Sequence, residues 1–135
     1  MDQSQPIIMK TLVYNAIRTP DGTVLESRHC HDYVTHVDKN GKEYILDGGL
    51  DYVRRSINGD EVLLQVYMED GHEKVREFLK WGTRGIKGDE PLRYIPLKDM
   101  TTDHIQACLD TQSSMRPCVR ESMETELKYR NTYRM

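Results

Sequence analysis

Several arginine side chains in this sequence have the type and placement to bind an anion. Arg54 and Arg55 are adjacent, and Arg84 lies in a turn bounded by glycines. Arg116 and Arg120 flank the start of the last predicted helix. A guanidinium group presents planar N–H donors that match the oxygens of a phosphate. These arginines therefore favour phosphate recognition, and the alternative is that each lies on a hydrated surface.

Two aromatic residues lie close to this glycine-rich turn in the sequence. Trp81, the only tryptophan, is expected between a helix end and the turn at 82–91, and Tyr94 follows Arg93 on the other side. An aromatic ring beside an arginine can stack on a purine while the guanidinium holds its phosphate. The pattern predicts a nucleotide site, and the alternative is that both rings belong to the core. The turn itself is not a Walker sequence, because no Gly-Lys-Ser/Thr closes it.

Potential metal ligands are densest at His29-Cys30-His31-Asp32, with His36 and Asp38 nearby. A zinc site usually combines two close ligand pairs separated by a dozen or more residues, and the sequence has no Cys-x-x-Cys pair. We therefore expect polar residues at strand ends here, with no bound metal and no cofactor. A metal-dependent phosphohydrolase that uses the cluster at 29–32 stays an alternative.

A nucleophilic cysteine would need a base close in space, and His104 precedes Cys108 by one helical turn. Cys108 also falls on the predicted buried face of that helix, where a thiol behaves as a small apolar group. The spacing favours core packing, so we expect no catalytic residue and no enzyme.

Length and composition limit the other possibilities. The chain has 135 residues, with 19 Lys and Arg against 22 Asp and Glu, for a net charge of −3. This length predicts one domain over 1–135. The charge balance argues against general binding of double-stranded nucleic acid. No apolar run approaches the ~20 residues of a membrane span. The first residues lack the pattern of a secretion signal, and three widely spaced cysteines favour a reducing cytoplasm.

Apolar and alternating stretches in the first half predict β-strands. These stretches are 7–17, 23–27, 33–37, 43–47, 50–56 and 61–68. The last of them is apolar enough for a central strand. Asn40-Gly41 predicts a hairpin turn, because glycine tolerates a positive φ. We therefore expect an N-terminal antiparallel sheet of about four to six strands over about 7–68.

The second half predicts helices over about 71–81, 102–112 and 117–130. The sequence Asp70-Gly71-His72-Glu73 has the pattern of a capping box, and Gly82 is expected to end the first helix. Thr101 or Thr102 is expected to cap the second helix. Pro117 suits the first turn of the third. Between the first two helices, the sequence over 92–97 predicts a short extended segment at a sheet edge. The fold class is therefore α+β, a sheet followed by a short helix and two C-terminal helices.

Over residues 15–55 the chain resembles a group of small phage proteins of mostly unknown function. The motifs that carry this resemblance are Asn15-Ala16-Ile17, Glu26-Ser27-Arg28, His31-Asp32, Asp47-Gly48-Gly49 and Tyr52-Val53-Arg54-Arg55. The second half adds Phe78 to Gly82, Leu97 to Met100, Asp103-His104-Ile105 and Glu126 to Arg130. Two close cysteine pairs of that group are absent here. If relatives hold zinc with those pairs, ordinary hairpins replace the metal in this chain.

Among phage proteins of this size, the chain is similar to the sponge proteins that counter the Thoeris defence system. That resemblance implies dimers that assemble into hexamers, and sequestration of a cyclic ADP-ribose isomer, or of a cyclic oligonucleotide of CBASS defence, without cleavage. It implies ligand contacts from sheet and helix arginines and from a stacked aromatic ring. The residues expected to bind the ligand are Arg28, Arg54, Arg55, Trp81, Arg84, Tyr94, His104 and Arg120.

The resemblance thus implies a phage anti-defence protein in the cytoplasm of an infected bacterial host. The expected ligand is a cyclic nucleotide, and the other expected partner is a second copy of the chain. A protein inhibitor of a host enzyme is the main alternative, and it would present an exposed apolar patch. A small early phage protein that only self-assembles is a further alternative.

Overall fold

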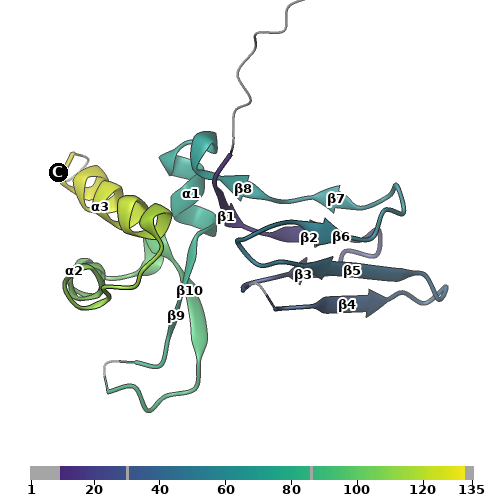
Figure 1. The fold of residues 1–135 in the computed structure, drawn as a ribbon, viewed down its shortest axis with the longest axis horizontal. Coiled ribbons are helices and arrows are strands. Elements are labelled where there is room, and N and C mark those ends of the chain that lie inside the picture. Colours follow the sequence, from purple (N-terminus) through teal and green to yellow (C-terminus); the bar gives the residue numbers. More distant parts are fainter. Residues whose placement is uncertain (1–9, 30, 86, 133–135) are drawn as a thin grey trace, which may run out of the picture.

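The structure is a computed structural model that describes residues 10–29, 31–85 and 87–132. It has the α+β class that the sequence predicts, with short antiparallel strands followed by a short helix and two C-terminal helices. The chain forms two lobes (Figure 1). We call residues 17–63 the strand lobe, and residues 11–14 with 66–132 the helix lobe. The chain crosses between them twice, at residues 15–16 and 64–65.

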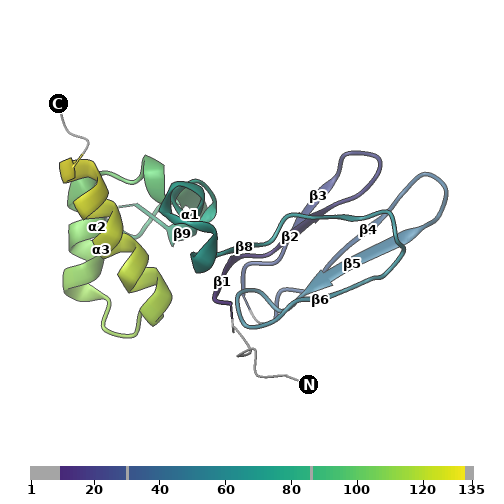
Figure 2. The same ribbon diagram turned by 90° about the horizontal axis from the view of Figure 1, so that it is seen from above.

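The strand lobe consists of two small antiparallel sheets. One has the order β3-β2-β7, and its strands are Val24–Glu26, Ala16–Arg18 and Val62–Leu63. The other has the order β4-β5-β6, with Val34–Val37, Glu43–Asp47 and Arg54–Arg55. The two sheets form separate layers in the view from above (Figure 2).

A small hydrophobic cluster fills the space between these layers. It consists of Ile17, Leu25, Tyr44 and Leu46, with Val34 packed against them. The predicted Asn40-Gly41 hairpin is confirmed, since β4 pairs with β5 and Gly41 has a φ of 82°. Alternation of side chains along each strand is what places these apolar residues on the inner faces.

The helix lobe contains the main core. Strands β1 (Leu12–Tyr14) and β8 (Val66–Tyr67) pair with each other, and the 3₁₀ turn η1 (Met68–Asp70) leads into α1 (His72–Phe78). A β-ribbon of β9 (Lys80–Thr83) and β10 (Arg93–Pro96) follows, then η2 (Leu97–Asp99), α2 (Thr102–Thr111) and α3 (Pro117–Thr132).

The main core collects apolar residues from most of these elements. Its fully buried members include Val66, Leu97, Ile105 and Met123. Cys108 is also buried, and burial raises the pKa of its thiol. Core packing is therefore the role of Cys108, as the helical spacing predicts.

The two C-terminal helices begin and end close to where the sequence places them. The Thr101 hydroxyl accepts a hydrogen bond from the His104 N–H, so the predicted N-cap of α2 is confirmed. Pro117 is the first residue of α3. Its missing N–H costs nothing there, because the first N–H groups of a helix have no partner within the helix. No helix among the described residues is both long and apolar enough to cross a lipid bilayer.

The predicted helix over 71–81 is too long. Helix α1 ends at Phe78, and Lys80–Thr83 forms β9, because these residues pair with β10 along the chain. The predicted capping box is also wrong. Gly71 occupies the N-cap, and the Asp70 carboxylate accepts instead from the Tyr67 N–H, 2.9 Å away.

The predicted strands over 50–56 and 61–68 are only partly formed. Of the first, Arg54–Arg55 is a strand. The second is interrupted at residues 64–65, where the chain crosses between the lobes, and becomes β7 and β8. It is not a central strand, since β7 lies at a sheet edge with Val62 and Leu63 44% and 53% exposed. The stretch 7–17 gives β1 and β2, and its residues 7–9 lie outside the described residues.

Candidate functional site

A small cavity of about 50 Å³ lies where the two lobes meet. The strand lobe contributes Glu26, Ser27, Arg28 and Leu50, and the helix lobe contributes Val13, Tyr14, Phe78, Lys80 and Tyr94. Asn15, at the first crossing, completes the lining. A cavity of this volume holds a few water molecules or one small anionic group.

The Glu26 carboxylate lies at the centre of the polar groups in this cavity. Its Oε2 accepts from the Tyr14 hydroxyl at 2.6 Å and from Lys80 Nζ at 2.8 Å. Its Oε1 accepts from Arg28 Nη2 at 2.9 Å. Burial pushes the pKa of Glu26 upward, but the hydrogen bonds and positive charges of these partners outweigh burial and lower it. Glu26 is therefore ionised near neutral pH, and the described residues of the cavity include two cations and one carboxylate.

The aromatic rings of the cavity are held against its cations. The Arg28 guanidinium lies 4.5 Å from the centroid of the Tyr94 ring, and Lys80 Nζ lies 5.5 Å from that of Tyr14. Tyr14 also packs against Phe78, with centroids 5.1 Å apart. Burial and the adjacent Glu26 carboxylate raise the pKa of the Tyr14 hydroxyl, so it stays protonated and donates.

The register of the β-ribbon explains why Tyr94 reaches this cavity. Tyr94 pairs with Gly82, and Trp81 pairs with Ile95. Residues directly opposite in an antiparallel pair share a face, so Trp81 and Tyr94 lie on opposite faces of the ribbon. A Cβ at Gly82 would lie 3.1 Å from a Tyr94 ring carbon, so the absence of a side chain at Gly82 leaves room for the ring.

Trp81 packs instead against the main core, half-buried. Trp81 and Tyr94 of one chain therefore do not face the same space. Because Trp81 occupies the other face, Tyr94 is the aromatic residue of the predicted pair that lines the cavity.

A hydrogen-bonded junction fixes the backbone of Arg28 beside the cavity. The Asn15 side-chain amide donates to the carbonyl oxygens of Asp47, Gly49 and Tyr52, at 3.3, 2.9 and 3.3 Å. Its oxygen accepts from Gln65, which joins the two crossings of the chain. The motif residues Asn15 and Asp47-Gly48-Gly49, far apart in sequence, thus meet in one place.

Ser27 and Asp32 extend this junction to Arg28. The Ser27 hydroxyl donates to the Asp32 carbonyl oxygen at 2.7 Å and accepts from the Gly49 N–H at 2.8 Å. The Asp32 carboxylate accepts from the Arg28 N–H at 2.8 Å. Gly49 has a φ of 55°, and a Cβ there would lie 2.2 Å from the His29 carbonyl carbon, so only glycine fits. Within these motifs, Asn15, Ser27, Asp32 and Gly49 therefore have a structural role, which is to position Arg28.

The other predicted ligand residues lie away from this cavity. Arg54 is exposed on β6, and Arg55, beside it, donates to the Ser56 carbonyl oxygen. Arg84 is exposed beyond β9, and His104 is partly buried on α2. Of the predicted set, the structure brings Arg28 and Tyr94 together, whereas Arg54 and Arg55 lie on β6, Arg84 lies beyond β9 and His104 lies on α2.

Arg120 has a different environment. Its guanidinium donates to the carbonyl oxygens of Leu109 and Gln112, at 3.1 and 2.8 Å, and so binds the C-terminal end of α2. It also borders an open groove of about 560 Å³, between η1 and the start of α3. The charged residues that line this groove are Arg120, Glu69, Glu121 and Glu124. Three carboxylates against one guanidinium give the groove a negative charge, which disfavours an anionic ligand.

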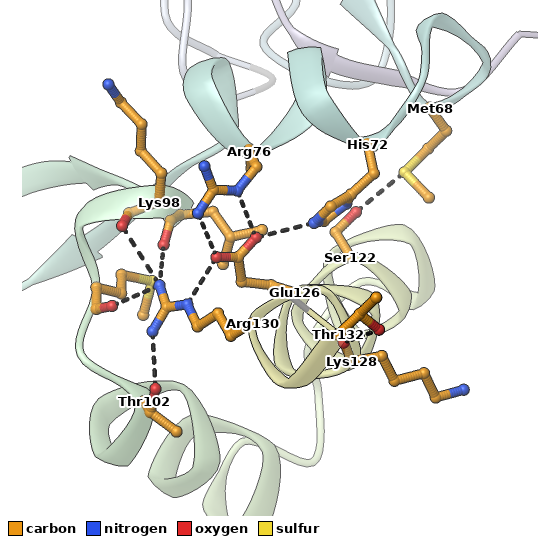
Figure 3. A network of polar contacts seen from close by, with 12 residues as sticks. Met68, His72, Arg76, Lys98, Thr102, Ser122, Glu126, Lys128, Arg130 and Thr132 are labelled. Atoms are coloured by element: carbon orange, nitrogen blue, oxygen red, sulfur yellow. Dashed lines mark hydrogen bonds and ion pairs between the residues drawn. The ribbon is translucent and has the colours of Figure 1, made fainter. Parts of the chain in front are cut away.

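A second cluster of charged residues joins the helices (Figure 3). Glu126 on α3 is fully buried and accepts from Arg76, Arg130 and His72 at 2.7 to 2.9 Å. Burial pushes the pKa of Glu126 upward, but the hydrogen bonds from the two arginines and His72 outweigh it and lower the pKa to about 2.

The groups around Glu126 are occupied by other parts of the protein. Arg130 also donates to the Thr102 hydroxyl and to the carbonyl oxygens of Leu97 and Met100. Arg76 lies over the Tyr129 ring, with its guanidinium carbon 4.5 Å from the centroid. This cluster therefore holds α1, α2 and α3 together and is not a ligand site.

The cluster of potential metal ligands does not assemble in the described residues. His29 and His31 are exposed in a turn, and Cys30 lies outside the described residues. His36 instead pairs with Asp21, with 2.9 Å between His36 Nε2 and a carboxylate oxygen. Within residues 10–29, 31–85 and 87–132, no three His, Cys, Asp or Glu side chains are grouped to hold a metal ion.

Sequence reasoning missed Glu26 and the two residues, Tyr14 and Lys80, that contact its carboxylate in the cavity. Tyr14 lies within the predicted strand stretch 7–17, Lys80 lies within the predicted helix over 71–81, and Glu26 belongs to a motif of the resemblance. Their meeting depends on contacts between positions 54 residues apart, such as Lys80 with Glu26. The order of charges along the chain gives no signal of such a contact.

Comparisons with known proteins give no match: no protein-family model, no curated protein and no solved structure corresponds to this chain. The resemblance to small phage proteins therefore rests on the sequence motifs, the likeness to sponge proteins rests on the size and layout of the chain, and both stay predictions.

Proposed function

We propose that this chain is a phage anti-defence protein that binds a cyclic nucleotide second messenger at the junction cavity and sequesters it without cleavage. The ligand would be a cyclic ADP-ribose isomer or a cyclic oligonucleotide, in the cytoplasm of an infected bacterial host. The observation that carries the proposal is the position of the Arg28 guanidinium over the Tyr94 ring, beside Lys80, at the rim of a cavity of about 50 Å³.

The unused hydrogen-bonding groups of the cavity favour an anion. Both oxygens of Glu26 are already occupied, whereas Arg28 and Lys80 each use one donor group on Glu26. A guanidinium has five N–H groups and an ammonium has three, so most donors of these two residues remain available. The side chains of Arg28 and Lys80 are 42% and 27% exposed, which lets a ligand reach them. A phosphate is an acceptor-only group that matches this set.

The size of the cavity indicates how such a ligand would lie. It admits one phosphate, and the rest of a nucleotide would extend over the rim, where Tyr94 offers an aromatic surface. Among the described residues that line the cavity, none is positioned to activate a nucleophile. The Tyr14 hydroxyl stays protonated because its pKa is raised, so it does not act as a base. The Glu26 carboxylate accepts hydrogen bonds from three donors, so its oxygens are already occupied. These features support binding without turnover.

Calorimetry with variants of the cavity tests this proposal. We expect micromolar or tighter binding of a cyclic ADP-ribose isomer or a cyclic trinucleotide, and recovery of the same molecule by mass spectrometry. Arg28→Gln and Tyr94→Leu should each weaken binding at least tenfold, about 1.4 kcal/mol. The matched control Arg54→Gln, which removes the same charge from β6, should bind like the wild type. Flat titrations with both ligands refute the proposal, and a chemically altered ligand would make the protein an enzyme.

Self-association is also proposed, at the exposed edge of the strand lobe. Strand β7 lies at a sheet edge, with Val62 and Leu63 half-exposed, and Ile57 in the preceding loop is 84% exposed. An apolar edge strand can pair with a second copy and bury these side chains. Light scattering after gel filtration should give a dimer or hexamer, and Leu63→Lys should shift it toward the monomer.

The same surface favours the second candidate function, an inhibitor that binds a host protein. If the wild type is monomeric at all concentrations, the apolar residues of β7 are free for a different protein. The oligomeric state therefore separates the two roles of this edge.

A further inference from the structure

Glu26 is an unusual residue for a site that binds an anion, because a carboxylate repels one. Among the described side chains that line the junction cavity, it carries the only negative charge, and Arg28 and Lys80 carry the positive charges. Its side chain is 17% exposed, and every oxygen has a donor. With Glu26, these side chains have a net charge of +1, whereas Arg28 and Lys80 alone would give +2.

The contacts of Glu26 resemble those that a bound phosphate oxygen pair would make. One oxygen contacts Tyr14 and Lys80 and the other contacts Arg28, at 2.6 to 2.9 Å. In the absence of a ligand, this carboxylate therefore occupies the strongest donors of the cavity. An incoming anion meets its charge at short range, where the effective dielectric constant is lower than that of water.

We infer that Glu26 is a specificity-determining residue, an internal counter-ion that suppresses general anion binding and makes recognition depend on contacts beyond the phosphate. This inference rests on the proposed function, since it concerns the same cavity. A small inorganic anion gains only the net +1 charge and the remaining donors. A nucleotide adds stacking on the Tyr94 ring, which Glu26 does not oppose. The carboxylate therefore lowers the affinity for free phosphate and pyrophosphate more than it lowers the affinity for a stacked ligand.

Pyrophosphate is the probe that isolates this effect, because it has charge and no ring. We expect Glu26→Gln to bind pyrophosphate about tenfold more tightly than the wild type, which corresponds to about 1.4 kcal/mol. Glu26→Asp, which keeps the charge, should bind it as weakly as the wild type. Glu43→Gln is the matched control, since it removes the same charge from an exposed position of β5. Unchanged or weaker binding by Glu26→Gln overturns the inference.

Two further measurements keep the test decisive. Circular dichroism and thermal unfolding report whether Glu26→Gln is folded, and Glu26→Ala is a second neutral variant with the same expected gain. The cyclic nucleotide is titrated into the wild type in parallel. If Glu26→Gln binds pyrophosphate more tightly but the wild type binds no cyclic nucleotide, the proposed function is refuted and the role of Glu26 stands. If the wild type binds the cyclic nucleotide but Glu26→Gln gains no affinity for pyrophosphate, the proposed function stands and the role of Glu26 is refuted.

Discussion

Replacement of Glu126 by glutamine tests whether the buried carboxylate holds the helices together. The substitution keeps the shape of the side chain and removes its charge. Arg76 and Arg130 would then lose the anion that both now contact at 2.7 to 2.8 Å. Loss of one partner from a buried ion pair costs about 3–5 kcal/mol. The two arginines are 22% and 23% exposed and can partly rehydrate, so we expect a loss of about 3 kcal/mol.

The pH dependence of stability gives an independent estimate from the same residue. The pKa of Glu126 is about 2 in the folded protein, below its ordinary value of 4.5 in the unfolded chain. A carboxyl with a lowered folded pKa stabilises the protein above the unfolded pKa, and this stability is lost as the pH falls from 4.5 through about 2. As the pH falls over this range, the free energy of unfolding of the wild type should therefore decrease by about 3 kcal/mol more than that of Glu126→Gln.

Urea unfolding followed by circular dichroism measures both quantities. The loss at pH 7 should appear as a lower midpoint with an unchanged slope, and as a decrease in Tm of about 10 °C. Glu124→Gln is the matched control, since Glu124 is exposed on the same helix. A change below 1 kcal/mol for Glu126→Gln, or an equal change for Glu124→Gln, would show that the cluster does not hold the helices together.

Two more substitutions probe the crossings and the helix ends. Asn15→Ala removes the donor of the Asp47, Gly49 and Tyr52 carbonyl oxygens, so we expect a loss of about 2–3 kcal/mol in urea unfolding. Because these hydrogen bonds also position Arg28, the affinity for an anion should fall together with the stability. An Asn15→Ala variant as stable as the wild type would contradict the structural role of Asn15. Thr101→Ala removes the N-cap of α2 and should cost about 1 kcal/mol, which Thr101→Ser should restore.

The parts of the fold that depend on neighbouring residues could be predicted from the sequence. The Thr101 cap, the Pro117 start and the Asn40-Gly41 turn each follow from the chemistry of one or two residues. The β-ribbon could be predicted only in part. The stretch 92–97 is expected to be extended, whereas Lys80 and Trp81 fall in the predicted helix, and Lys80–Thr83 becomes a strand only through its pairing with Arg93–Pro96.

The candidate site shows the same division. Tyr94 could be named from its chemical type, whereas Arg28 follows only from the resemblance to phage sponge proteins. The two glutamates that join separate elements, Glu26 and Glu126, could not be identified, since a glutamate in a sequence is expected at the surface. Glu126 is buried because Arg76 reaches it across 50 positions, and Glu26 is engaged because Lys80 reaches it across 54. Contacts of this kind depend on the completed fold.

The central claim is that the junction cavity binds the phosphate of a cyclic nucleotide, and backbone NMR of the isotope-labelled protein tests it most directly. Titration with a cyclic ADP-ribose isomer, and separately with a cyclic trinucleotide, should shift the amide signals of Arg28, Leu50, Lys80 and Tyr94. The signals of Arg54 on β6 should stay in place. Unchanged spectra at millimolar concentrations of both ligands, or shifts confined to the groove at Arg120, would contradict the claim.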